Sequence, residues 1–567
     1  NKSSSIQFFD PLAVIPDSVL DTSGTPDTTI PEGIPDDIPS VPDDIPSVPD
    51  DIPSIPEGIG GSIPDVPGLP DLSGLSDGAL PADLSSFLPS QIGELNPEQL
   101  ADFTPDMMAE FSPDQFAELS PDLMKSFSPD QFAGLTPDLM KSFSPEQFTA
   151  VDPAAFAGIQ ADQVKKLSAK LVGQFTPEMF AELPDDAIAG FKAKAFASLP
   201  ADVFGAFDAG QFGELSSKLI ETISSEQFSE LAPGLMKSFS PEQFMAIDPS
   251  AFAGFQADQL KNLSTKLVEQ FTPEMFAELP DDAIAGFKKK AFASLPADVF
   301  GAFDAGQFGE LSSKMIKSID SEQFSQLANS VMKSIDLDQF MALSPDAFAG
   351  FQANQLKSLP VNLVQEMTAK MFAQLPADAI SGFKAKAFSA LSSEALGAFN
   401  SEQFSELSAK LVKSMGLDQF ESLSPEAFAG FQASQLKKIK TDLLAGMDPD
   451  AFSGINPDAF SGFSPKKINA LPDDLIGEIS PEQLSSFKPT LFRKMDDDLF
   501  ESFRPKAIAG LTPEQSAKMN QVVASKFDVK QIQSIKPECL ASMPKSVFNF
   551  LEDDLSAEQI AGLEQIS

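Results

Sequence analysis

The sequence contains no histidine, tryptophan or tyrosine, and it has a single cysteine, Cys539. Histidine is the most common general base and a frequent metal ligand in proteins, so its absence argues against most enzyme chemistry. One cysteine excludes both an intramolecular disulfide framework and a thiolate metal cluster. We therefore predict that the protein is not an enzyme and has no cofactor.

Basic residues and long apolar runs are also scarce. The 567 residues include 39 Lys+Arg and 83 Asp+Glu, which gives a formal net charge of -44. Such a surface repels nucleic acid, and the longest lysine cluster, at 288–290, is too short to offset it. No apolar run approaches the roughly 20 residues that a membrane span requires. The sequence thus predicts neither a nucleic-acid partner nor a transmembrane segment, while 52 phenylalanines supply material for a core.

The first 80 residues differ in composition from the rest, because they hold 15 acidic residues and one basic residue. Within them a seven-residue repeat, PDDIPSV, recurs. Frequent proline removes amide donors and favours extended, polyproline II-like backbone, so we predict an extended tail over residues 1–80. Apolar residues spaced alternately by four and three predict that this tail docks on protein, although a plain linker is the alternative. These residues are Ile34, Ile38, Val41, Ile45, Val48, Ile52, Ile55 and Ile59.

Residues 81–551 repeat with a period of eight. A large apolar residue recurs every eight positions from Phe87 to Leu551, and a second apolar position lies five residues after these anchors, as in Phe116, Met124 and Phe132. Spacings of five and three do not form a fixed stripe on a helix of 3.6 residues per turn, and recurring proline excludes one continuous helix. Representative core anchors are Phe111, Phe116, Leu119, Phe127, Phe132, Leu135, Phe143 and Phe148.

Each octad also carries a signal for a helix start, as in Ser128-Pro129-Asp130. The hydroxyl caps free amides, proline suits the first helical position, and the carboxylate complements the helix dipole. Burying two apolar side chains contributes about 3–6 kcal/mol, whereas ordering eight residues costs about 8–16 kcal/mol, so octads must stack to fold. We predict an all-α, elongated α-solenoid or superhelix of octapeptide repeats, with one short helical turn per octad.

Two longer periods are superimposed on the octads. Gln-Phe octads alternate in places with Leu-Met octads, which predicts a two-octad structural unit. Residues 168–223 recur at 264–319 with six differences in 56 positions, and more loosely at 360–415. Recent duplication explains this 96-residue super-repeat, and the alternative is that twelve octads close an integral number of coils. Late octad glycines such as Gly190 and Gly205 are predicted to let coils approach closely.

The apolar register slips by four after Leu551, as Leu555 and Ile560 show, so residues 552–567 are predicted to form a cap or junction. The lone Cys539 lies at a position that we predict to be half-buried, as a small hydrophobic residue and not a nucleophile. Carboxylate pairs such as Asp185-Asp186 are best explained as helix starts, so no metal site is predicted. Diffuse calcium cross-linking of the acidic surface is left open, as is glycosylation at sequons such as Asn262-Leu263-Ser264.

Two functional hypotheses follow from the repeats and the tail. The preferred one is a structural subunit of a filament or extracellular matrix fibre, in which the tail of one copy docks on the solenoid of the next, so that the main partner is the protein itself. The alternative is a monomeric acidic scaffold that binds a basic protein on the concave face of the solenoid. The chain begins with Asn1 and not with methionine, which is compatible with removal of a signal peptide or with truncation of a longer chain. We expect an extracellular protein, with a cytoplasmic one as the alternative.

Overall fold

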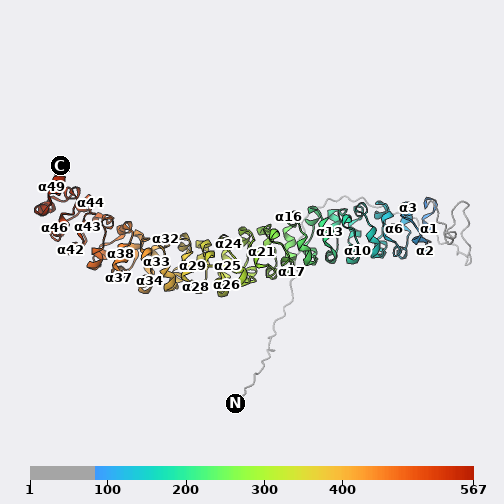
Figure 1. Ribbon diagram of the computed structural model, residues 1–567, viewed down its shortest axis with the longest axis horizontal. Helices are drawn as coiled ribbons and strands as arrows, with labels where there is room; N and C mark the ends of the chain where they lie inside the picture. The colour runs from blue at the N-terminus through green and yellow to red at the C-terminus, as the bar shows by residue number, and fades with distance from the viewer. Residues whose placement is uncertain (1–83, 567) are drawn as a thin grey trace, which may run out of the picture. The chain divides into compact units, whose positions relative to one another are not determined.

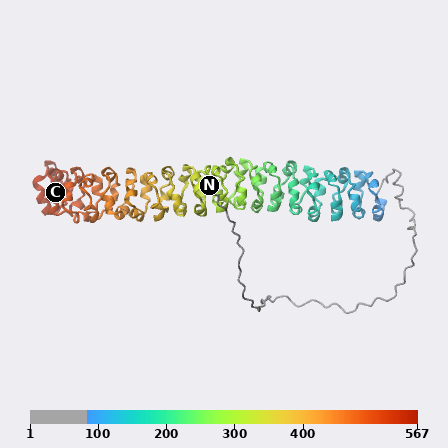
Figure 2. The same ribbon diagram turned by 90° about the horizontal axis from the view of Figure 1, so that it is seen from below.

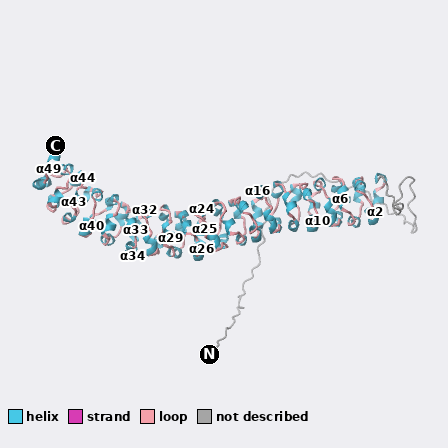
Figure 3. Ribbon diagram, viewed as in Figure 1, coloured by secondary structure: helices cyan, strands magenta, loops and turns pink. Residues whose placement is uncertain are grey.

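The computed structural model describes residues 84–566, which all belong to the second of the chain's two units, Gly68–Ser567. The regular elements of this described part are all helices, without a strand (Figure 3). They contain three to six residues each, except for α48 (Lys545–Leu551) and α49 (Ala557–Ile566). The predicted all-α solenoid is therefore confirmed. The predicted tail, with its residues from Ile34 to Ile59, lies outside the described residues.

Each octad forms one short helix, and in many octads a Ser, Thr, Asp or Asn residue is its N-cap, as Ser128 is for α6 (Pro129–Gly134). The backbone N–H of Gln131 donates to the Ser128 hydroxyl at 3.2 Å, and the Ser128 N–H donates to Oε1 of Gln131 at 2.9 Å. This reciprocal capping box, together with proline at the first helical position, fixes where the helix starts. The helix ends at Leu135, whose backbone is extended. Several octads form a 3₁₀ turn instead, such as η4 (Pro153–Gly158).

The two apolar positions of the octads form one continuous core. All eight representative anchors are buried, with at most 5% of their surface exposed. Phenylalanines of successive coils meet edge to face: the ring centroids of Phe116 and Phe143 lie 4.7 Å apart, and those of Phe148 and Phe175 lie 5.2 Å apart. An octad is therefore buried by residues about 27 positions away as well as by its neighbours in the chain, as the contact between Phe148 and Phe156 shows.

One coil of the solenoid takes between three and four octads. Helix α6 packs against α3 (Pro105–Ala109) and against η4, which lie three octads before and after it. The side chain of Gln131 reaches the carbonyls of Leu100 and Phe103, which lie 31 and 28 residues earlier. Figures 1 and 2 show the short helices following one another in chain order along the solenoid. The arrangement is that of a repeat protein whose coils contact only neighbouring coils.

Glycine is required where two coils meet most closely. A Cβ atom on Gly158 would lie 1.8 Å from the carbonyl oxygen of Pro129, and one on Gly190 would lie 2.1 Å from that of Ala161. The prediction for Gly190 is thus confirmed. The prediction for Gly205 is wrong, because a Cβ atom there would be 3.5 Å from the nearest carbonyl, which is an ordinary contact.

The C-terminal end follows a shifted register. The side-chain nitrogen of Gln559 in α49 donates to the carbonyls of Ile532 and Ile535 at 2.9 and 2.7 Å. These partners lie 27 and 24 residues earlier, each four fewer than the separations found for Gln131. The difference equals the four-residue slip of the apolar pattern after Leu551. Helix α49 is thereby attached to the preceding coil by the same kind of bonds, with four fewer residues between the partners.

Candidate functional site: the glutamine ladder and the C-terminal groove

A series of buried glutamines joins each coil to the preceding one, as Gln259 in α17 (Ala257–Leu260) shows. Its Oε1 accepts from the backbone N–H of Gln256 at 2.8 Å, while its Nε2 donates to the carbonyls of Phe228 and Leu231, both at 2.9 Å. One fully buried side chain thus caps its own helix and satisfies carbonyls at the end of a helix on the preceding coil. Gln339 and Gln419 are half-buried and reach one carbonyl of the preceding coil, whereas the other glutamines of the series are buried and reach at least two. We call the whole set the glutamine ladder: Gln115, Gln131, Gln147, Gln163, Gln211, Gln227, Gln243, Gln259, Gln307, Gln323, Gln339, Gln355, Gln403, Gln419, Gln435, Gln483, Gln515, Gln531 and Gln559.

The ladder residues recur every second octad, which gives the alternation of octad types a structural role. Between them the same helical position is apolar, as with Leu123 and Leu139, which are buried. The ladder is interrupted at positions spaced by 96 residues, so the super-repeat is visible in the bonding pattern as well as in the sequence. The interruptions with this spacing are Met179, Met275 and Met371, followed one ladder step later by Ala195, Ala291 and Ala387. Nearer the C-terminus, Ala451, Leu499 and Val547 also occupy ladder positions.

Lysine replaces glutamine at one ladder position, Lys467 in α39 (Pro465–Ile468). Its Nζ donates to the carbonyls of Leu436 and Ile439 at 2.5 and 2.6 Å, which are the partners that a glutamine would have. The residue is only 7% exposed. Burial lowers the pKa of Lys467 to about 8, although the two carbonyl acceptors favour the charged ammonium. Sequence reasoning missed this buried lysine, although its place at a multiple of 16 residues from Gln435 could have indicated it.

Cysteine occupies the same helical position in an octad between two ladder positions, Cys539 in α47 (Pro537–Ala541). Its Sγ donates to the carbonyl of Leu511 at 3.1 Å, 28 residues earlier. The side chain is fully buried, so the predicted half-buried position is wrong: the third helical position faces the preceding coil. Burial raises the pKa of this thiol, which keeps it protonated at neutral pH.

The carboxylate pair Asp185-Asp186 lies at a helix start but does not cap the helix. Asp185 and Asp186 are the first two residues of α11 (Asp185–Ile188), whose N-cap is Pro184, so they act only on the dipole of the helix. The pKa of Glu482 is lowered by the hydrogen bond from its own backbone N–H and then by the Ser480 hydroxyl. Within residues 84–566, acidic and cysteine side chains form no cluster that could hold a metal ion.

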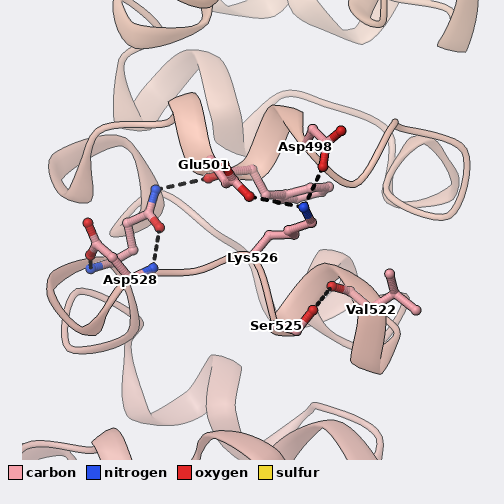
Figure 4. Close-up of polar contacts among 8 residues, drawn as sticks. Asp498, Glu501, Val522, Ser525, Lys526 and Asp528 are labelled. Carbon is pink, nitrogen blue, oxygen red and sulfur yellow. Dashed lines mark hydrogen bonds and ion pairs between the residues drawn. The ribbon is translucent and has the colours of Figure 1, made fainter.

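The C-terminal coils carry ion pairs between coils. Lys526 lies between Asp498 and Glu501, with its Nζ 3.0 Å from Oε1 of Glu501 (Figure 4). The hydrogen bond to Asp498, followed by that to Glu501, raises the pKa of Lys526 above its ordinary value. Arg504 pairs with Glu478 in the same way across 26 residues. In this region Lys and Arg are as frequent as Asp and Glu: residues 430–551 have 15 of each, whereas residues 84–429 have 23 basic and 47 acidic residues.

An apolar groove of about 760 Å³ lies between α47, α48 and α49. Leu540 and Met543 line it as buried residues, whereas Ile560 and Ile566 are 46% and 52% exposed, so the groove opens to solvent. We call this feature the C-terminal groove. Its other lining residues are Ala541, Lys545, Phe548, Glu552, Leu555, Leu563 and Glu564.

The remaining predicted positions are placed as follows. The sequon residue Asn262 donates from Nδ2 to the carbonyl of Asp258 at 2.8 Å, and Ser264 caps α18 (Thr265–Val268). The sequon at residues 1–3 lies outside the described residues. No helix among residues 84–566 has both the length and the hydropathy of a membrane span.

No protein-family model matches the chain, and no curated protein matches it by sequence. Among solved structures, the Rif1 N-terminal domain from Saccharomyces cerevisiae is 11% identical with a TM-score of 0.17; the match covers 83% of this chain and 56% of that domain. The structure of APUM23-GGAGUUGACGG is 15% identical with a TM-score of 0.16, covering 82% of this chain and 95% of that one. Likenesses at this level carry no argument about function.

Proposed function

We propose that this chain is a structural protein that assembles into a filament, in which the N-terminal tail of one copy docks on the C-terminal coils of the next. The observation that supports it is the distribution of charge. The tail has 15 acidic residues and one basic residue, and residues 84–429 are also strongly acidic, whereas residues 430–551 are balanced. An acidic tail is repelled by the coils of residues 84–429 and not by those of residues 430–551. Contact between two different surfaces of identical copies produces an open polymer when the rotation does not close.

The chemistry of the tail fits a contact with a repeated surface. A heptad in polyproline II conformation spans roughly 22 Å. This length is close to the depth of two layers of helices that pack about 8–10 Å apart, so the Ile and Val residues of successive heptads could enter successive grooves between helices. Proline has no N–H group, so docking leaves fewer buried donors without a partner. The extracellular setting predicted from the sequence is part of this proposal.

Electron microscopy of the full chain, beside a version lacking residues 1–75, tests the proposal. We expect filaments of variable length from the full chain and only single particles from the shortened one. Circular dichroism serves as the control, because residues 84–566 should keep their helicity without the tail. Filaments that persist after removal of the tail would contradict the proposed contact.

A pair of charge reversals tests where the tail docks. Lys488 and Lys494 are exposed residues of the balanced C-terminal coils, so Lys488→Glu with Lys494→Glu should shorten the filaments. The matched control is Lys314→Glu with Lys317→Glu, which changes the net charge equally on exposed positions of the acidic coils. Equal effects of the two double variants would show that overall repulsion, and not a local contact, controls assembly.

The second candidate function is a monomeric scaffold for a basic protein. The 24 excess acidic residues of 84–429 favour it, because they form an extended field that attracts a cationic partner. The two functions differ in oligomeric state. A chain that stays monomeric at every concentration in sedimentation experiments, and that captures a basic protein, would replace the filament proposal.

A further inference from the structure

The C-terminal groove combines an apolar floor with an acidic rim. Glu552 and Glu564 line it, and Asp553, Asp554 and Glu558 are exposed next to them in the sequence. Lys545 is the single basic residue among its lining side chains. The acidic tail is therefore a poor occupant of this groove, since like charges would face each other.

We propose that the C-terminal groove binds a basic amphipathic helix of another protein. Such a helix would place its apolar stripe against Leu540, Met543 and Ile560 and its flanking Lys or Arg residues against the acidic rim. The volume of about 760 Å³ is sufficient for a row of apolar side chains. This contact goes beyond the proposed filament, because it joins the chain to a different partner at a different place.

The groove is held open by the fold and does not depend on the partner for its shape. Helix α49, which forms one wall, is attached to the preceding coil through both bonds of Gln559, and Ser556 completes its capping box. Its apolar residues Ile560 and Ile566 nevertheless remain about half exposed. A preorganised apolar surface of this kind loses little entropy when a helix binds it.

Because the sequence contains no tryptophan or tyrosine, the fluorescence of a Trp placed in a peptide can be measured without a Trp or Tyr background from the protein. A synthetic amphipathic helix of Leu and Lys, with one Trp on its apolar face, reports binding through the emission of that Trp alone. We expect a blue shift and saturable binding that weakens with salt. Two further peptides serve as comparisons: a scrambled version of the same composition, and tail residues 34–59 with one added Trp.

Two substitutions of equal exposure separate the groove from the general acidic surface. Ile560→Asp should weaken binding at least about tenfold, because a charge would enter the apolar contact. Met245→Asp is the matched control, since Met245 is also 46% exposed but lies far along the chain in α16 (Pro241–Met245). Glu552→Lys should weaken binding and reduce its salt dependence.

Three outcomes would overturn the proposal. Equal binding of the scrambled peptide would mean that charge alone attracts it. An unchanged affinity in Ile560→Asp would place the contact elsewhere. Binding of the tail peptide that is lost in Ile560→Asp would make the tail the occupant. None of these results decides whether filaments form, so the proposed function is tested separately by electron microscopy.

Discussion

Replacing Lys467 with glutamine should stabilise the solenoid at neutral pH. The lysine is buried at a ladder position, and burial lowers its pKa from 10.5 to about 8. A pKa shift of this size means that keeping Lys467 charged destabilises the folded state by about 3 kcal/mol. The two carbonyl acceptors partly offset the cost of burying the charge. In Lys467→Gln the amide would keep both carbonyl bonds without a charge, and its Oε1 would accept from Ser464 as in the other capping boxes.

The stability difference between the two chains should depend on pH, and the lowered pKa of Lys467 determines the direction of this dependence. Because the pKa of Lys467 is lower in the folded state, the unfolded state binds more protons between about pH 8 and pH 10.5, and stability rises with pH over that window. The glutamine variant lacks this rise. Its advantage, up to about 3 kcal/mol at neutral pH, should therefore shrink as the pH increases through that window.

Hydrogen exchange of the amides in α39 and around Leu436 measures the local effect, and denaturant unfolding followed by circular dichroism measures the global one. Both are needed because repeat arrays do not always unfold in a single step. Lys466→Gln is the control, since this exposed neighbour in α39 removes the same charge without changing a ladder bond. A glutamine variant that is less stable at neutral pH, or whose advantage is independent of pH, would refute the reasoning.

Three further substitutions or treatments test the packing between coils. In Gln259→Glu the buried side chain would present a carboxylate to two carbonyls. We expect the free energy of unfolding, measured with denaturant, to fall by about 3 kcal/mol or more at neutral pH and to recover partly in acid, where the carboxylate is protonated. Gly158→Ala should cost a few kcal/mol because the new Cβ would clash with Pro129, whereas Gly213→Ala, with nothing within 4 Å, should be neutral or stabilising by at most about 1 kcal/mol. The thiol of Cys539 should react with an alkylating reagent only as fast as its coil opens, and rapid labelling of the folded chain would contradict its burial.

The octad and its short helix could be predicted from the sequence because their signals are local. Ser128, Pro129 and Asp130 specify the start of α6 within four residues, and Phe132 and Leu135 supply its buried face. These choices act on the same octad, so the hydrophobic period and the capping pattern agree without knowledge of the partner coil.

The number of octads in a coil and the place of the groove could not be predicted in this way. The bonds of Gln259 run to residues 28 and 31 positions earlier, and no local pattern states that distance. In the sequence Gln259 reads as an ordinary helix-start residue, since only its Oε1 serves its own octad. The C-terminal groove depends on how α49 lies against α47 and α48, although the four-residue slip after Leu551 indicated that the repeat changes there.

The glutamine ladder also explains how a chain with so regular a core selects one register. Apolar anchors recur every eight residues, so sliding one coil past the next by a single octad would bury nearly the same apolar surface. Ladder glutamines recur every sixteen, and the same slide would move Gln259 away from its two acceptors. The carbonyl of Phe228 would keep the N–H of Leu231 as a donor, whereas the carbonyl of Leu231 would face an apolar side chain. Each buried carbonyl without a partner costs about 1–3 kcal/mol, and the cost recurs at every rung. The core therefore supplies the stability of the solenoid, while the ladder of polar side chains determines how many residues make up a coil.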